Sequence, residues 1–164
     1  MWAWPVRDTL DMTTVMLCTD GSDLALDALR QGLALLAPAD RLVLVTVAPG
    51  VDPSLVTGTG FAGGVMSIDD KEALLERERQ EAQEILDETV TELGLDPASA
   101  PETMVLVGDP GHEICELATF LPADVVVIGT HGRSGIKRAM MGSTSDHVVR
   151  HAACPVLVQG RADT

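Results

Sequence analysis

One stretch of the chain, Asp124 to Ser143, most constrains the fold that the protein can adopt. It begins with the apolar run Val125 to Ile128, whose length and β-branched content are typical of a strand buried on both faces of a parallel sheet. Gly129 and Gly132 follow this run. Because glycine has no Cβ, this spacing allows a tight turn and a close approach of the backbone to a ligand.

The end of the same stretch is typical of a phosphate-binding helix start. Residues Gly142 to Ser145 are small and rich in hydroxyls, and a helical pattern follows them. The exposed N–H groups and the positive end of a helix dipole at such a start can hold a phosphate. Arg133, Lys137 and Arg138 lie between the two glycine turns, either as phosphate contacts or as a solvated basic face. The whole stretch predicts the phosphate site of a nucleotide.

Length and composition favour one domain with an aliphatic core. The chain has 164 residues and is 46% hydrophobic, yet it contains only two Phe, two Trp and no Tyr. No run reaches the roughly 18 apolar residues of a membrane span, and the N-terminus lacks a basic region followed by an apolar stretch. The three cysteines have no CxxC spacing and are expected to be free thiols in a reducing compartment. We therefore expect a soluble, cytoplasmic protein.

The net charge of −14 argues against a partner that is itself a polyanion. Nucleic acids and anionic membranes both require a cationic surface. Three of the eleven Lys and Arg residues nevertheless fall within the six positions 133–138. A local basic patch on an acidic protein suits a small anionic ligand better than a polymer.

Strand and helix patterns alternate along the chain. Buried strands are predicted at Val15–Thr19, Leu42–Val47, Thr103–Val107, Val125–Ile128 and Pro155–Gln159. Helices are predicted after Ser22, after Asp69 or Asp70 (with Leu74, Ala82, Ile85, Thr89 and Leu93 on its apolar face), from Pro110 with Asp109 as N-cap, and from Ser143 to His151. Residues Ala48 to Ser67 are predicted to form a long loop.

This alternation predicts an α/β fold with a single doubly wound, open, parallel five-stranded sheet and helices on both faces. We expect the flavodoxin-like strand order 3-2-1-4-5. Ligands of such sheets bind outside the carboxyl ends of the strands at the topological switch point, here between strands 1 and 4. Asp20 ends the first strand and Gly129 ends the fourth, so the predicted crevice and the glycine motif coincide.

At these residues the sequence resembles the universal stress protein family. The ATP-binding signature of that family is Gly-x2-Gly-x9-Gly-Ser/Thr, which Gly129, Gly132, Gly142 and Ser143 match. The resemblance also includes four further segments: Asp20-Gly21-Ser22, Gly108-Asp109-Pro110, Ala123-Asp124 and Arg150 to Val158. It implies a nucleotide-binding domain over residues 12–160, preceded by an N-terminal extension, 1–11, that contains both Trp residues, and followed by a short tail, 161–164.

The resemblance also implies a role for each site residue. Asp20 would lie in the adenine-side pocket, and the backbone near Val47 would contact the base. Gly129 would approach the ribose, and Gly132, Gly142 and Ser143 would wrap the phosphates. The remaining candidates beside the phosphates are Thr144 and, from the basic segment, Arg133. The family commonly dimerises through its last strand, here Pro155 to Gln159.

We therefore expect a homodimeric, regulatory stress-response protein that binds ATP with Mg²⁺. One alternative is a slow ATPase or an autokinase with Ser143, Thr144 or Ser145 as the phosphate acceptor. A second alternative is a nucleotide-independent interaction module or chaperone-like dimer. The sequence indicates no catalytic residues and no metal site: His147 and His151 have the spacing of paired ligands on a helix, but no third ligand is evident beside them.

Overall fold

The computed structural model describes residues 13–36, 38–50, 67–95, 101–130 and 141–160. Its elements in chain order are β1 (Thr14–Cys18), α1 (Asp23–Leu36), β2 (Arg41–Ala48), α3 (Ile68–Leu93), β3 (Glu102–Val107), α4 (Pro110–Phe120), β4 (Val125–Gly129), α5 (Ser143–His151) and β5 (Val156–Gln159). Every predicted strand and helix is present, with ends that differ by one or two residues. Most of the predicted loop, 51–66, and the whole N-terminal extension lie outside the described residues.

The five strands form one parallel sheet in the order β3-β2-β1-β4-β5, which confirms the predicted topology. The central strand β1 pairs with β2, where Cys18 lies opposite Val45, and with β4, where Met16 lies opposite Val126. The direction of winding reverses between β1 and β4. The carboxyl ends of these two strands therefore meet at a topological switch point.

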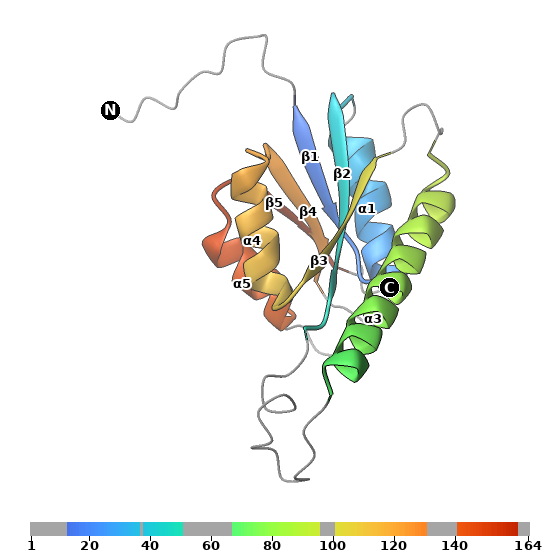
Figure 1. The fold of residues 1–164 in the computed structure, drawn as a ribbon. Helices are drawn as coiled ribbons and strands as arrows, with labels where there is room; N and C mark the ends of the chain where they lie inside the picture. Colours follow the sequence, from blue (N-terminus) through green and yellow to red (C-terminus); the bar gives the residue numbers. More distant parts are fainter. Residues whose placement is uncertain (1–12, 37, 51–66, 96–100, 131–140, 161–164) are drawn as a thin grey trace.

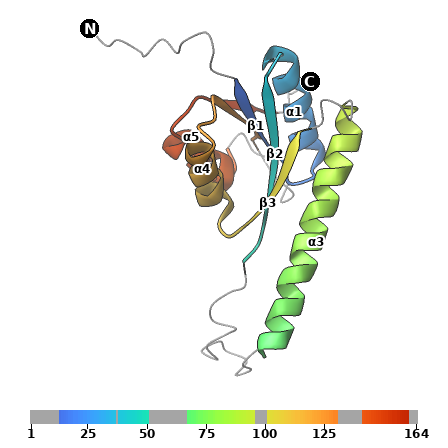
Figure 2. The ribbon, with the colours of Figure 1, turned by 45° about the horizontal axis from the view of Figure 1, so that its top comes forward.

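Helices cover both faces of the sheet. Figures 1 and 2 show α1 and α3 on one face and α4 and α5 on the other. Alternate residues of β1 supply the two cores: Val15 and Leu17 pack with α1 and α3, and Met16 and Cys18 pack with α4 and α5. Both faces of a central strand are therefore apolar, as a doubly covered parallel sheet requires.

The long helix α3 lies between two capping residues. The Ser67 side chain accepts a hydrogen bond from the Asp70 N–H at its start, and Gly94 ends it in the left-handed conformation at φ 62°. Ten acidic and only three basic side chains belong to this helix, so it carries half of the net charge of −14. In the described parts of the chain, no helix combines the length and the apolar character needed to cross a bilayer.

The apolar face of α3 contains one buried residue, Leu86, that was not predicted. Ala82, Leu86 and Thr89 are buried, whereas the predicted residues Leu74, Ile85 and Leu93 are half-buried. Leu86 is fully inaccessible and packs in the core that α1 shares with the sheet. Leu86 was missed because Leu86 and Ile85 are both apolar and neighbouring positions on a helix differ by only about 100°.

This difference can be tested by paired substitutions. Leu86→Ala is expected to lower the free energy of unfolding by about 3 kcal/mol, because it leaves a cavity in a closed core. Ile85→Ala is expected to cost about 1 kcal/mol, because the side chain is already partly in water. Urea unfolding followed by circular dichroism measures both values, and equal costs would contradict the assignment of the buried face.

Candidate functional site

A cavity of about 250 Å³ opens at the carboxyl ends of β1, β2 and β4. The first turns of α1, α4 and α5 complete its walls. Its lining residues are Cys18, Thr19, Asp20, Ala25, Val45, Thr46, Val47, Pro110, Ile114, Ile128, Gly129, Thr130, Gly142, Ser143, Thr144 and Ser145. The cavity therefore lies at the switch point between β1 and β4.

Six of the eight site residues predicted from sequence line this one cavity. They are Asp20, Val47, Gly129, Gly142, Ser143 and Thr144. The other two, Gly132 and Arg133, lie outside the described residues, as do Lys137 and Arg138. Residues far apart in the chain, such as Asp20 and Gly142, thus meet at one site, and their roles toward a ligand stay a prediction.

The turn that carries Asp20 is held by side-chain hydrogen bonds. Asp20 Oδ1 accepts from the Ser22 N–H at 3.1 Å and from the Ser22 hydroxyl at 2.6 Å. Ser22 Oγ in turn accepts from the Ala25 N–H at 3.2 Å, which makes Ser22 the N-cap of α1. This local network fixes the direction in which the Asp20 carboxylate enters the cavity.

A chain of hydroxyl groups joins the same turn to α3. The Gly21 N–H donates to Thr19 Oγ1 at 3.1 Å, and Thr19 Oγ1 lies 3.4 Å from Thr89 Oγ1. The Thr89 hydroxyl donates to the Ile85 carbonyl at 2.7 Å. Since its hydrogen is used there, Thr19 must be the donor in the contact with Thr89. Thr19 lines the cavity, but its hydroxyl is committed to holding the turn.

The two ends of the glycine motif are hydrogen-bonded to each other. The Thr130 carbonyl, directly after β4, accepts from the Gly142 N–H at 2.7 Å and from the Ser145 hydroxyl at 3.0 Å. Ser145 is only 2% exposed and also bonds the Gly142 carbonyl. These contacts bring the start of α5 beside the end of β4. They also assign Ser145 a structural role.

The start of α5 has donors that no side chain caps. Gly142 occupies the N-cap position in an extended conformation, and no side-chain cap bond is made there. The N–H groups of the first helical turn have no partner within a helix. Ser143 is exposed and Thr144 is half-buried, and both line the cavity. Backbone donors and two hydroxyls therefore gather at this end of the site.

Gly129 has a packing role as well as a place in the cavity. A Cβ at this position would lie 3.4 Å from Ala25 Cα and 3.4 Å from the Leu24 carbonyl oxygen. The missing side chain therefore lets the first turn of α1 approach the end of β4. Because this is contact distance and not a clash, alanine is expected to be accommodated here.

Several lining residues were not predicted from the sequence. Val45, Ile114 and Ile128 supply an apolar wall, and Thr46 and Thr130 add polar groups. The switch-point rule points to the ends of β1 and β4, and this rule would also have found Thr130. The first turn of α4 enters the site through tertiary packing, for which the sequence carries no local signal.

Cys18 lies on the cavity wall as a neutral thiol. Burial raises its pKa to about 12, and the neighbouring Cys115 and Cys154 add to the rise. All three cysteines are free. Burial also raises the pKa values of Cys115 and Cys154, which are less enclosed. A thiolate nucleophile at Cys18 is therefore not available near neutral pH.

Alkylation should distinguish the three thiols. At pH 8 a pKa near 12 leaves roughly one thiolate in ten thousand at Cys18. We expect iodoacetamide to spare Cys18 in the native protein, to modify Cys115 and Cys154 slowly, and to modify all three after unfolding. Peptide mass spectrometry measures this order, and modification of Cys18 as fast as Cys154 would contradict it.

The comparison with protein families agrees with the motif and the fold. The model of the universal stress protein family matches residues 12–159. The chain belongs to this family. It is 33% identical to Universal stress protein MJ0531 of Methanocaldococcus jannaschii over 88% of this chain and 79% of the relative. It is also 30% identical to Universal stress protein Sll1388 of Synechocystis over 88% and 95% of the two chains.

Solved structures of other family members have the same fold. Universal stress protein UspA from Lactobacillus plantarum superposes with a TM-score of 0.69 at 24% identity and covers 90% of this chain and 97% of its own. A universal stress protein in complex with cAMP gives 0.59 at 24% identity, covering 90% and 95%. The Archaeoglobus fulgidus protein in complex with dAMP gives 0.52 at 22% identity, covering 90% and 97%.

Proposed function

We propose that this universal stress protein binds ATP with Mg²⁺ at the switch-point cavity and acts as a regulatory dimer in a stress response. The observation that carries the proposal is the position of the cavity, which connects the carboxyl ends of β1 and β4 with the start of α5. Relatives with the same fold that are in complex with cAMP and dAMP support an adenine nucleotide as the ligand class.

The chemistry of the cavity matches the parts of a nucleotide. Val47, Ile114 and Ile128 offer apolar surface to a base. Asp20 would accept hydrogen bonds on the base and ribose side. The α5 start, with Ser143 and Thr144, would receive the phosphates, which fits the preference of helix N-termini for anions. Gly132 and Arg133 would add to the phosphate side.

The size of the cavity sets how the ligand would lie. Ligand pockets usually enclose roughly 300–1,000 Å³, and this cavity has about 250 Å³. A nucleoside would therefore fill it, and the phosphates would extend along the α5 start. Mg²⁺ prefers oxygen ligands. The Asp20 carboxylate and the Ser143 and Thr144 hydroxyls could hold it beside the phosphate oxygens, where it would neutralise their charge.

The lining favours a binding equilibrium over rapid turnover. Among the described lining residues Asp20 is the only carboxylate, whereas two-metal phosphoryl transfer uses several. Autophosphorylation would have to use Ser143 or Thr144, because the Ser145 hydroxyl is buried and hydrogen-bonded. We infer that ATP occupancy is the regulatory signal. With three free thiols, the protein would act in the reducing cytoplasm.

A charge placed at the phosphate end tests the nucleotide proposal. Ser143→Glu should keep α5 folded, because an acid is favourable at a helix start, yet it should repel phosphates. We expect ATP affinity to fall at least about tenfold, which corresponds to 1.4 kcal/mol. Isothermal titration calorimetry of the nucleotide-free protein with ATP, AMP and cAMP measures these affinities. Analysis of the nucleotide released from freshly purified protein shows which nucleotide the native chain carries.

Ile68→Glu is the matched control for this substitution. It adds the same charge at the first residue of α3, where Ile68 is 76% exposed and does not line the cavity. This variant should bind ATP as the native chain does. Equal binding by Ser143→Glu would place the ligand elsewhere. No nucleotide in the native protein and no ATP binding would favour the interaction module.

The dimer is proposed to form through β5. This strand is at the edge of the sheet, and its four residues are half-buried. The carbonyls of Pro155 and Gln159 accept hydrogen bonds from Val126 and Thr130 on the β4 side. Alternation along the strand then directs the backbone groups of Val156 and Val158 away from β4, where a second copy could pair with them.

Val158→Pro tests this edge. Proline removes the outward N–H but no bond to β4, so the fold should persist, as edge strands tolerate it. We expect a larger monomer fraction at a given concentration in sedimentation velocity. Val158→Thr keeps the N–H and should dimerise like the native chain. A native chain that sediments as a monomer at every concentration would refute the proposed dimer.

A further inference from the structure

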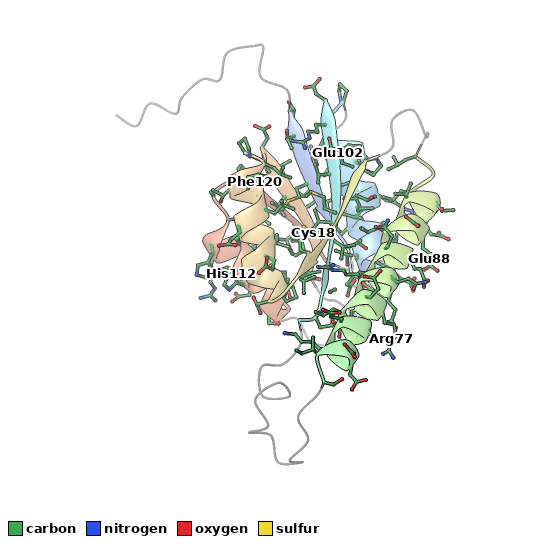
Figure 3. The ribbon with its side chains drawn as sticks, viewed as in Figure 1. Cys18, Arg77, Glu88, Glu102, His112 and Phe120 are labelled. Carbon is green, nitrogen blue, oxygen red and sulfur yellow. The ribbon has the colours of Figure 1, made fainter. Side chains whose placement is uncertain are left out.

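A second hollow lies on the outer side of α4 and α5, away from the switch-point cavity. Three of the four histidines of the chain line it, His112, His147 and His151, together with Glu113 and Glu116. Figure 3 shows His112 on the outer side of α4, on the opposite side of the molecule from Glu88 of α3. This concentration of imidazole and carboxylate groups is not explained by the proposed nucleotide site.

His112, Glu113 and Glu116 form a compact group of potential metal ligands. One donor atom from each lies within 4.8 Å of the other two. His112 Nδ1 is 3.6 Å from Glu113 Oε1, and His112 Nε2 is 3.6 Å from Glu116 Oε1. Two ligands on a tetrahedral ion with bonds of about 2.1 Å lie roughly 3.4 Å apart. The two carboxylates face different nitrogens of the His112 ring, and one ion binds only one of these nitrogens. The exposed Glu116 side chain would therefore have to rotate to the Nδ1 side to place all three residues on one ion.

The backbone holds two of these ligands in place. The Glu113 side chain is 29% exposed and packs on Gly108, where a Cβ would lie 2.8 Å from Glu113 Oε1. Gly108 has φ +145°, a conformation that other residues rarely adopt. The His112 N–H donates to the Asp109 carboxylate at 3.0 Å, which fixes the first turn of α4. Glu116 follows His112 by one helical turn and is exposed.

The α5 histidines are neighbours of this group and not members of it. A Cβ on Gly111 would lie 2.8 Å from the Cβ and Cγ of His147, so His147 packs on the same turn of α4. Its ring stacks on that of His151 with centroids 4.2 Å apart. His151 Nδ1 is 2.8 Å from the His147 carbonyl, so Nδ1 is the donor of that hydrogen bond.

We propose that His112, Glu113 and Glu116 bind one divalent transition-metal ion of the Zn²⁺ type, with water completing its coordination. One imidazole and two carboxylates are a ligand set suited to Zn²⁺, and imidazole favours such ions over Mg²⁺ and Ca²⁺. A dication would also offset the two negative charges of the carboxylates. The site uses a different histidine from the His147 and His151 pair, which has the spacing of paired ligands on a helix but no third ligand evident in the sequence.

Zinc titration of the metal-free, nucleotide-free chain with reduced thiols tests this proposal. Isothermal calorimetry should show one site per chain. His112→Ala and Glu116→Gln should each weaken Zn²⁺ binding by at least about tenfold, since even second-shell partners of metal ligands contribute that much. Both residues are exposed, so both variants should fold, which circular dichroism can check. Glu88→Gln on α3 is the control and should bind Zn²⁺ as the native chain does.

The other possible ligands give distinct outcomes. A His147→Ala/His151→Ala variant should retain Zn²⁺ binding. If this double variant loses Zn²⁺ binding while the His112→Ala variant keeps it, the proposal is overturned. Titration with Co²⁺ should produce no thiolate-to-cobalt charge-transfer band, and such a band would assign the ion to Cys115 instead. If no substitution changes Zn²⁺ binding, or if the native chain does not bind Zn²⁺, the three side chains form only an ion-paired surface cluster and the proposal fails.

Discussion

The burial of β1 on both faces is the constraint on which the rest of the structure depends. Val15, Met16 and Leu17 have no accessible surface, and Cys18 has 4%. A strand with two apolar faces cannot exist without helices on both, and parallel neighbours require those helices as crossover connections. The same strand is the point at which the chain changes its direction of winding. The cavity at its carboxyl end follows from the topology.

Many polar groups at this end of the sheet are already used to build the site. Thr19 bonds Thr89, Ser22 caps α1, and Ser145 closes the motif against Thr130. A ligand therefore meets the backbone donors of α5, the Asp20 carboxylate and the hydroxyls of Ser143 and Thr144. This division explains why hydroxyl residues that look equivalent in the sequence have different environments. Only the packing distinguishes Ser143 from Ser145, two positions along the same helix.

The sequence was sufficient to predict the strand order, because periodic apolar runs and glycine turns are local signals. It also placed Asp20 and Gly129 at one edge, since the ends of parallel strands meet there. Pro110 and Ile114 could not be assigned to the cavity in this way, because their position depends on how α4 packs across the sheet. The same limit applies to His112, Glu113 and Glu116: their spacing is unremarkable in the sequence, and the side-chain conformations bring their donor atoms together.

The uneven charge of the molecule has a consequence for the speed of ligand capture. Helix α3 carries ten acidic side chains, on the face of the sheet opposite α4 and α5 (Figure 1). An anionic ligand that approaches from solution meets the long-range field of a chain with a net charge of −14. Salt screens this field over about 10 Å at 0.1 M but leaves short contacts at the α5 start largely intact. For this protein, added salt should therefore accelerate the encounter with an anion, whereas it slows the encounter in proteins that attract their ligands electrostatically.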